Sequence, residues 1–207
     1  TRDGTRVRLS WRHPGAAADG GESPGAGATR VFLRLLGEVQ AENAALAALA
    51  VRRVLPEMTL PTLVRGLEEA YIPGRFQRIQ DDPPVYVDGS HTPLSVGRLL
   101  HSFLELHPRP DTLVLGIVAG KRYEEIAEIL CPRFLSVIVP TPGTFKASEP
   151  ERVFAACLRH NPRARLIPAA GAALETAVRE AGGRGGSVLV TGSFYLAGEI
   201  LRLYQKT

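Results

Sequence analysis

Residues 85–93 read VYVDGSHTP, so three apolar residues run directly into a carboxylate, an imidazole and two hydroxyls. This change in composition predicts a buried strand that ends in a polar turn. The turn could be a site in which Asp88 and His91 meet a ligand. Asp88 could equally cap the turn, and His91 could be an ordinary exposed or hydrogen-bonded histidine. The residues of the turn leave both interpretations open.

Polar residues also follow the later strands that the pattern predicts: Gly116 and Gly120-Lys121-Arg122, Thr141 and Thr144, and Thr191-Gly192-Ser193. The carboxyl ends of parallel strands meet at one edge of a sheet, where ligands bind. A carboxylate, an imidazole, a cation and hydroxyls beside helix starts suit an anionic ligand and a sugar hydroxyl. In the simpler interpretation Lys121 is solvated and Ser193 caps the last helix. The Gly-x-x-x-x-Gly-Lys-Ser/Thr phosphate loop is absent from the sequence.

Short apolar strands alternate with helices from residue 75 onward. We predict strands at residues 75–80, 85–88, 112–118, 134–139, 165–167 and 187–191. We predict helices at residues 93–106, 123–130, 149–160, 171–181 and 194–204. Thr92 and Pro93 are typical of the start of a helix. This alternation predicts an α/β fold with a mostly parallel sheet and helices on both faces.

The first part of the chain has a different pattern. Strands are expected at residues 5–10 and 31–36, joined as a hairpin by a Gly-, Ala- and Pro-rich loop at 11–30. A long helix is expected at residues 41–55, and its apolar content predicts burial on most sides. A short helix starts at Pro61. A break near Pro73 and Gly74 divides the chain into domains at residues 1–72 and 73–207.

Composition narrows the possible partners and location. The 207 residues carry a net charge of +4 without a run of like charges or a basic stripe, so we expect no nucleic-acid partner. No stretch approaches the ~20 apolar residues of a membrane span, and the first residues lack the apolar region of a signal peptide. Cys131 and Cys157 are expected to be buried, reduced thiols, which favours a cytoplasmic location.

Several segments resemble, in the right order, the folylpolyglutamate synthases and dihydrofolate synthases of the Mur ligase superfamily. LGEVQAENAALAAL is similar to the family's Gly-His-Gln-x-x-Asn-Ala helix start, and IPGRFQRI to its Pro-Gly-Arg-Phe-Glu segment. VYVDGSHTP is similar to Leu-Asp-Gly-Ala-His-Asn-Pro, and LVTGSFYLAGEILRL to Thr-Gly-Ser-Leu-Tyr-Leu. LVLGIVAGKRYEEIAEIL occupies the place of a strand followed by Asp-Lys-Asp. The ordered set extends from about residue 36 to the end of the chain.

The resemblance implies an ATP-dependent ligase that converts a folate or dihydropteroate carboxylate to an acyl phosphate, which the amine of L-glutamate attacks. It also implies a Rossmann-like C-terminal domain preceded by the strand-and-helix tail of a Mur-ligase-type ATPase domain. ATP and Mg²⁺ are the expected cofactors, and a monomer is expected for the full-length protein. The chain would then occupy residues 1–72 as the tail and 73–207 as the glutamate ligase domain.

Roles in ATP binding follow from position in the matched segments. Asn43 would contact the adenine side of ATP, Arg75 would reach its phosphates, and Asp88 would accept hydrogen bonds from the ribose hydroxyls. A guanidinium matches phosphate oxygens and stays charged. His91 would lie near the reacting groups as the catalytic candidate, orienting or neutralising the phosphoryl group or glutamate.

Lys121 and Ser193 would bind the carboxylates of glutamate, and no residue of this chain is assigned to a metal. The sequence departs from the family at several of the matched positions: Val39 replaces His, Gln77 replaces Glu, Ser90 replaces Ala and Thr92 replaces Asn. Gly120-Lys121-Arg122 stands for Asp-Lys-Asp, which weakens the role given to Lys121.

The phosphate loop, magnesium ligands and folate-contacting loops of the family's first domain have no counterpart in this sequence. We therefore expect a C-terminal portion, either a fragment or one partner of a split enzyme, that is inactive alone, with the magnesium ligands outside it. Two alternatives stay open: a non-catalytic nucleotide- or metabolite-binding α/β module, and a Mur ligase that uses another acceptor. Whether both folate reactions occur is also left open.

Overall fold

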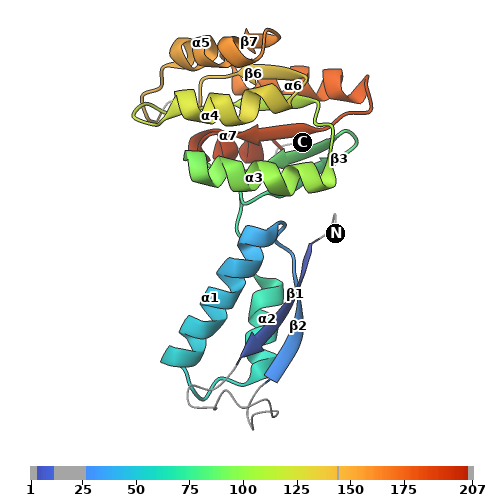
Figure 1. The fold of residues 1–207 in the computed structure, drawn as a ribbon, viewed down its shortest axis with the longest axis vertical. Helices are drawn as coiled ribbons and strands as arrows, with labels where there is room; N and C mark the ends of the chain where they lie inside the picture. Colours follow the sequence, from blue (N-terminus) through green and yellow to red (C-terminus); the bar gives the residue numbers. More distant parts are fainter. Residues whose placement is uncertain (1–3, 12–26, 144, 205–207) are drawn as a thin grey trace. The chain divides into compact units, whose positions relative to one another are not determined.

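The computed structural model describes residues 4–11, 27–143 and 145–204, and the chain divides into two compact units between Tyr71 and Ile72 (Figure 1). The second unit is built around a six-stranded sheet with the order β3-β4-β8-β5-β6-β7. The strands are β3 (Gln77–Asp81), β4 (Pro84–Val87), β5 (Thr112–Leu115), β6 (Ser136–Val139), β7 (Ala164–Leu166) and β8 (Val188–Thr191). Only β3 is antiparallel to its neighbour, so the predicted mostly parallel α/β sheet is confirmed.

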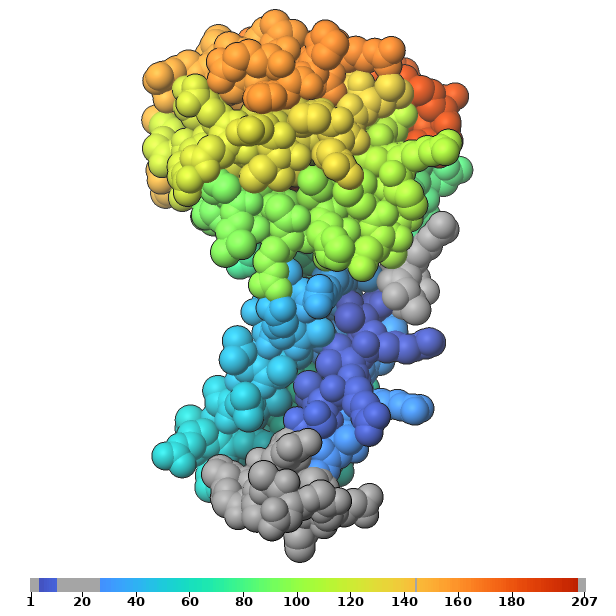
Figure 2. All heavy atoms as spheres, in the orientation of Figure 1, coloured from blue at the N-terminus to red at the C-terminus, as the bar shows by residue number. Residues whose placement is uncertain are grey.

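Helices cover both faces of this sheet. They are α3 (Pro93–Leu106), α4 (Tyr123–Leu130), α5 (Pro150–His160), α6 (Ala170–Gly182) and α7 (Phe194–Tyr204), with a 3-10 turn, η1, at Cys131–Arg133. Helices α3, α4 and α5 contact one another in turn on one face, and α6 contacts α7 on the other. Figure 2 shows α3, α4 and α5 closely packed, from green to orange. No helix in the described part of the chain is both long and apolar enough to cross a bilayer.

Local sequence signals set several of these boundaries. The predicted helices at residues 93–106, 123–130 and 194–204 are confirmed to the residue. At the start of α3, Thr92 Oγ1 accepts from Ser95 N, and Ser95 Oγ accepts from Thr92 N. These two hydrogen bonds form a capping box. The strand predicted at residues 112–118 is shorter, because β5 ends at Leu115 and Gly116 turns away after donating its N–H to Thr191 O.

The strands are buried because they pack against helices on both sides. On one side of the sheet, Val85, Val87 and Val190 belong to one buried cluster with residues of α6 and α7. Its α7 members include Leu196 and Ile200. On the other side of β4, Tyr86 meets Phe76 and Phe103 with ring centroids 5.1 and 5.6 Å apart. This double-sided burial explains the continuous apolar runs that predicted a parallel sheet.

Both cysteines are buried and free, as predicted. The hydrogen bond with Cys157, and burial after it, raise the pKa of Cys131 far above its usual value. The Cys131 thiol therefore stays protonated at neutral pH and is a core residue without the thiolate that reactivity requires.

The first unit is a hairpin covered by two helices. Strands β1 (Thr5–Trp11) and β2 (Gly27–Leu33) pair antiparallel, which confirms the hairpin, and residues 12–26 of its loop lie outside the described residues. Strand β2 lies earlier than predicted, because Leu33 pairs with Thr5 at the start of β1. Helix α2 (Leu60–Glu69) begins at the N-cap Thr59, with Pro61 in its first turn.

Helix α1 (Glu38–Val54) is less buried than the sequence predicted. Only Gln40, Ala44 and Ala48 are buried in it. Leu46 and Leu49 are 65% and 63% exposed, so the prediction of burial on most sides is wrong. An apolar count does not tell which sides of a helix have neighbours, and here a single stripe meets the rest of the unit.

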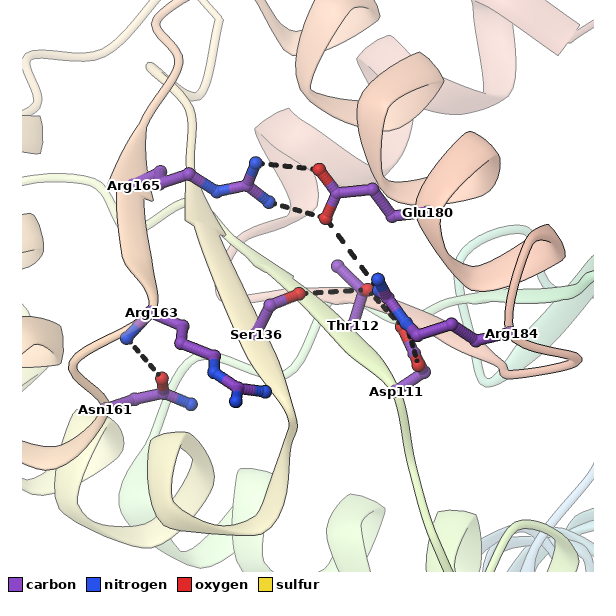
Figure 3. Close-up of polar contacts among 8 residues, drawn as sticks. All are labelled: Asp111, Thr112, Ser136, Asn161, Arg163, Arg165, Glu180 and Arg184. Atoms are coloured by element: carbon purple, nitrogen blue, oxygen red, sulfur yellow. Dashed lines mark hydrogen bonds and ion pairs between the residues drawn. The ribbon is translucent and has the colours of Figure 1, made fainter.

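Ion pairs between arginine and carboxylate side chains lie at the amino edge of the sheet (Figure 3). Arg184 donates from Nε and Nη2 to Asp111 at 2.8 and 2.6 Å, and Arg165 donates twice to Glu180 at 2.7 Å. Thr112 Oγ1 also donates to Asp111 at 2.7 Å. Burial raises the pKa of Asp111, but the hydrogen bonds from Arg184 and Thr112 outweigh it, so the pKa lies below its usual value. The bond from Arg165 likewise lowers the pKa of Glu180.

We expect these carboxylates to make the free energy of unfolding dependent on pH. Their pKa values are lower in the folded chain, so their contribution is complete above the unfolded value of about 4 and is lost as pH falls through the folded value. The urea midpoint should fall from about pH 5 to pH 3. Asp111→Asn should flatten this dependence, whereas Asp81→Asn, at an 82% exposed side chain, should leave it unchanged. If the urea midpoint fell equally with pH in the parent and in Asp111→Asn, Asp111 would not be a source of the pH dependence.

Candidate functional site

Asp88 lies at the carboxyl end of β4 and holds two backbone segments. Its Oδ2 accepts from Phe76 N and its Oδ1 from Ser90 N, each at 2.7 Å. The residue is only 5% exposed. Each oxygen of Asp88 thus has a partner within the fold, which gives it the turn-capping role that the sequence had left open. A carboxylate oxygen keeps a further lone pair, so contact with ribose hydroxyls stays a prediction.

Phe76 has an unusual backbone conformation that Asp88 supports. Its φ is 43°, in the left-handed region that non-glycine residues rarely adopt. Such a conformation persists only where its surroundings hold it. Here the Phe76 N–H is bound by Asp88, and its ring packs on Tyr86 and lies 6.2 Å from Phe103. The backbone conformation of Phe76 therefore affects the direction of the side chain of the preceding residue, Arg75.

Arg75 and His91 both contact the Phe194 ring. The Arg75 guanidinium carbon lies 4.5 Å from the centre of the Phe194 ring, and the His91 ring meets the same phenyl edge-on at 5.9 Å. A cation over an aromatic face is attracted by the ring quadrupole. Phe194 therefore brings together two of the predicted site residues, one from before β3 and one from after β4.

The tautomer of His91 follows from its hydrogen bond. Its Nδ1 lies 2.9 Å from Gly89 O, and a carbonyl can only accept, so Nδ1 carries the proton of that bond. In the neutral ring Nε2 then holds the lone pair. His91 is therefore oriented by its own turn, with Nε2 as the nitrogen able to accept a proton.

Phe194 is the site residue that the sequence interpretation missed. The sequence places Phe194 only at the start of a helix, where the matched family segment has Leu. Only the structure shows the fit, because an ideal Cβ at Gly89 would lie 2.2 Å from the Phe194 ring. Only glycine allows that approach, so a large aromatic in the Thr-Gly-Ser segment and the glycine of the Asp-Gly turn are complementary.

Ser193 lies at the same edge of the sheet, where backbone hydrogen bonds link the segments that follow β4 and β8. Gly192 N donates to Ser90 O at 3.0 Å, and Gly192 adopts a φ of 108° that suits glycine. Ser193 is 2% exposed, and its Oγ accepts from Leu196 N at 3.1 Å as the cap of α7. The capping interpretation of Ser193 is therefore observed, and its contact with glutamate stays a prediction.

Lys121 lies in the loop after β5, at the same edge of the sheet. This loop pairs with the loop after β6 through an isolated bridge between Val118 and Ser148. Lys121 is half-buried, and its side chain makes no hydrogen bond or ion pair with other described residues. Its ammonium group is thus available to an anion.

Asn43 belongs to the first unit. It is exposed on α1, and its Nδ2 donates to Gln40 Oε1 at 3.2 Å. Within residues 4–11, 27–143 and 145–204, no group of three or more His, Cys, Asp or Glu side chains could hold a metal ion.

Comparison with known proteins places the second unit in a described family. A model of the family described as "Mur ligase, glutamate ligase domain" matches residues 74–194. Folylpolyglutamate synthase of Lacticaseibacillus casei is 29% identical over 171 residues, which are 80% of this chain and 38% of that protein. A probable bifunctional folylpolyglutamate synthase/dihydropteroate synthase of Haloferax volcanii is 32% identical over 82% of this chain and 20% of its own length.

Solved structures agree with this relation. Folylpolyglutamate synthase of Mycobacterium tuberculosis, crystallised with ADP and AMPPCP, superimposes with a TM-score of 0.78 at 27% identity. The match covers 84% of this chain and 42% of that one. The chain thus spans less than half the length of each of these three relatives.

The fit between Gly89 and Phe194 can be tested by a mutant cycle. Gly89→Ala should lower the free energy of unfolding by about 1–3 kcal/mol, because the new methyl group overlaps the phenyl ring. In a Phe194→Ala background the same change should cost much less, since the ring is gone. Gly198→Ala, in α7 with open space around it, should be neutral or stabilising by up to about 1 kcal/mol. Urea unfolding measures all three, and equal costs of Gly89→Ala in both backgrounds would refute the contact.

Proposed function

Because the chain belongs to the Mur ligase family, whose glutamate ligase domain matches residues 74–194, we propose that it is the C-terminal portion of a folylpolyglutamate synthase. The complete enzyme would add L-glutamate to a folate at the expense of ATP, and could also act on dihydropteroate. The observation that carries the proposal is the cluster of Arg75, Phe194 and His91 at the carboxyl edge of the sheet. Ligands of open α/β sheets bind at this edge.

The chemistry requires activation of a carboxylate, which is a poor electrophile. Transfer of the γ-phosphoryl group of ATP to the folate carboxylate yields an acyl phosphate and ADP. The glutamate amine then attacks the carbonyl carbon, the C–O bond to phosphate breaks, and the amine releases a proton as the amide forms. Catalysis rests on positioning these groups and on neutralising phosphate charge.

Arg75 is suited to bind the phosphates. Its guanidinium makes no ion pair with another described residue, while Phe194 supports it from one side. All its N–H donors are therefore available for bidentate contact with phosphate oxygens. We assign Arg75 to the phosphates of ATP, a role for which its planar donor group is better suited than lysine.

His91 would act beside Arg75 on the reacting groups. With Nδ1 bound to Gly89 O, its Nε2 can accept the proton of the attacking amine or orient the phosphoryl group. Lys121, which has no partner in the described chain, would bind a carboxylate of glutamate. Ser193 would contribute through its hydroxyl proton, since the oxygen already accepts from Leu196 N.

Asp88 has two functions in this proposal. It holds Phe76 and Ser90, and so orients the segments that carry Arg75 and His91. Its remaining lone pairs would accept from the ribose hydroxyls. The first unit, including Asn43 on the adenine side, would be the tail of the ATP-binding domain, and the magnesium ligands would come from residues outside this chain. A cytoplasmic monomer is proposed for the complete enzyme.

The 207-residue chain by itself should form no folyl-glutamate product. It lacks the phosphate-loop pattern that Mur-type ATP use requires, and it covers only 20–42% of the length of the three relatives described above. The measurement is mass spectrometry after incubation with ATP, Mg²⁺, glutamate and tetrahydrofolate. The complete protein encoded by the gene, assayed in parallel, should form the product. Product from the chain alone would overturn the proposed division of the site, and none from either would overturn the function.

Arg75→Ala in the complete protein should raise the KM for ATP or lower kcat/KM about 10- to 150-fold, because it removes a charge-assisted contact worth roughly 1.5–3 kcal/mol. Arg75→Lys should recover part of this loss, since lysine restores the charge but cannot make the bidentate contact of a guanidinium. Arg109→Ala serves as the control, because Arg109 is exposed in the loop before β5, at the opposite edge of the sheet. Unchanged kinetics for Arg75→Ala would remove this residue from the site.

A further inference from the structure

Phe145 and Tyr195 form an aromatic pair at the carboxyl edge of the sheet. Their rings are stacked, with centroids 5.8 Å apart and planes inclined by 21°. Phe145 is 87% exposed, the most exposed of the large apolar side chains in the described residues. A large ring that the fold leaves in water offers a face for stacking with a ligand. Tyr195 is in the first turn of α7, the helix that follows Ser193.

Described residues on either side of Phe145 contact other parts of the unit. Before it, Gly143 adopts a φ of 60° and donates its N–H to Glu199 Oε2 of α7 at 3.0 Å. After it, Ala147 O accepts from Ala119 N at 2.9 Å, next to the bridge between Val118 and Ser148. The aromatic pair is therefore supported by α7 and by the loop after β5.

The charged side chains near the pair are two lysines and Glu199, whose carboxylate already accepts from Gly143 N. Lys146 follows Phe145 in the chain, and Lys121 lies in the loop joined to it by the Val118–Ser148 bridge. Neither lysine makes a hydrogen bond or ion pair with another described residue. The nearby Arg122 is different, because it pairs with Glu125. A ligand with both an aromatic ring and carboxylates would use the stack and the lysines together.

We propose that Phe145 and Tyr195 form a platform for the aryl ring of the acceptor, the p-aminobenzoyl group that carries the carboxylate to be extended or its first glutamate. This inference rests on the proposed function and adds to it the part of the substrate that this domain recognises. The aryl group lies within one glutamate of the bond that is formed when the acceptor is short. The platform therefore favours short acceptors and contributes less as the glutamate tail grows and moves the ring away.

Binding can be tested on the 207-residue chain with p-aminobenzoyl-L-glutamate as the probe, by NMR of the labelled Phe and Tyr ring carbons. The probe should shift the signals of Phe145 and Tyr195, and Phe145→Leu should abolish the shift of Tyr195. L-glutamate alone should leave both rings unperturbed. No shift with the probe, the same shift with glutamate alone, or a larger shift with ADP would each overturn the inference, the last by assigning the platform to adenine.

Kinetics of the complete protein provide a second test. Phe145→Leu should raise the KM for a monoglutamyl acceptor about three- to tenfold, the range expected for one aromatic contact, and leave the KM values for ATP and glutamate unchanged. The effect should shrink for an acceptor with four or more glutamates. Leu158→Ala, at an exposed residue of α5, is the matched control and should change none of these values. Equal KM values for Phe145→Leu and the parent would overturn the inference.

The two tests separate this inference from the proposed function. If the complete protein ligates glutamate but Phe145→Leu leaves the KM for the monoglutamyl acceptor unchanged, the platform is refuted and the function stands. If the complete protein forms no product, the function is refuted. The ring signals of the chain still decide whether Phe145 and Tyr195 bind an aryl carboxylate.

Discussion

The carboxyl edge of the sheet depends on one buried carboxylate that accepts two backbone N–H groups. Asp88 binds Phe76 N on one side and Ser90 N on the other, and hydrogen bonds to a charged acceptor are stronger than neutral ones. The first bond supports the left-handed conformation of Phe76. The second closes the turn that continues to His91. Arg75 and His91 therefore owe their positions to the same side chain, which itself makes little contact with solvent.

A steric constraint completes this arrangement. Gly89 leaves room for the Phe194 ring, and that ring contacts the Arg75 guanidinium and the His91 imidazole. The three segments come from before β3, after β4 and after β8. A change at any of them would alter the separation of the Arg75 guanidinium and the His91 imidazole, on which the proposed phosphoryl transfer would depend.

The two edges of the sheet use charge differently. At the amino edge, Asp111 and Glu180 each have a bidentate arginine partner, which stabilises the fold and satisfies the carboxylates. At the carboxyl edge, the described side chains of Arg75 and Lys121 have no acidic partner. Cations left without partners cost stability little when they remain hydrated, and they stay available to an anionic substrate. The carboxyl edge also has ion pairs, such as Arg122 with Glu125, but the cations proposed to bind an anion are its unpaired ones.

The sequence alone determined the order and type of the elements, because those signals are local, whereas the bounds of β2 and β5 differ from the prediction. Thr92 and Pro93 set the start of α3, and uninterrupted apolar runs marked β5, β6 and β8 as buried parallel strands. It also located the polar turn at Asp88. Only the tertiary structure decided that the partner of Asp88 is Phe76 N, twelve residues away, and that Phe194 joins Arg75 to His91. Those contacts depend on strand pairing and on a glycine-sized gap, and neither is encoded in the spacing of residues along the chain. The same reason explains the exposed leucines of α1, since burial requires a neighbour that apolar composition does not specify.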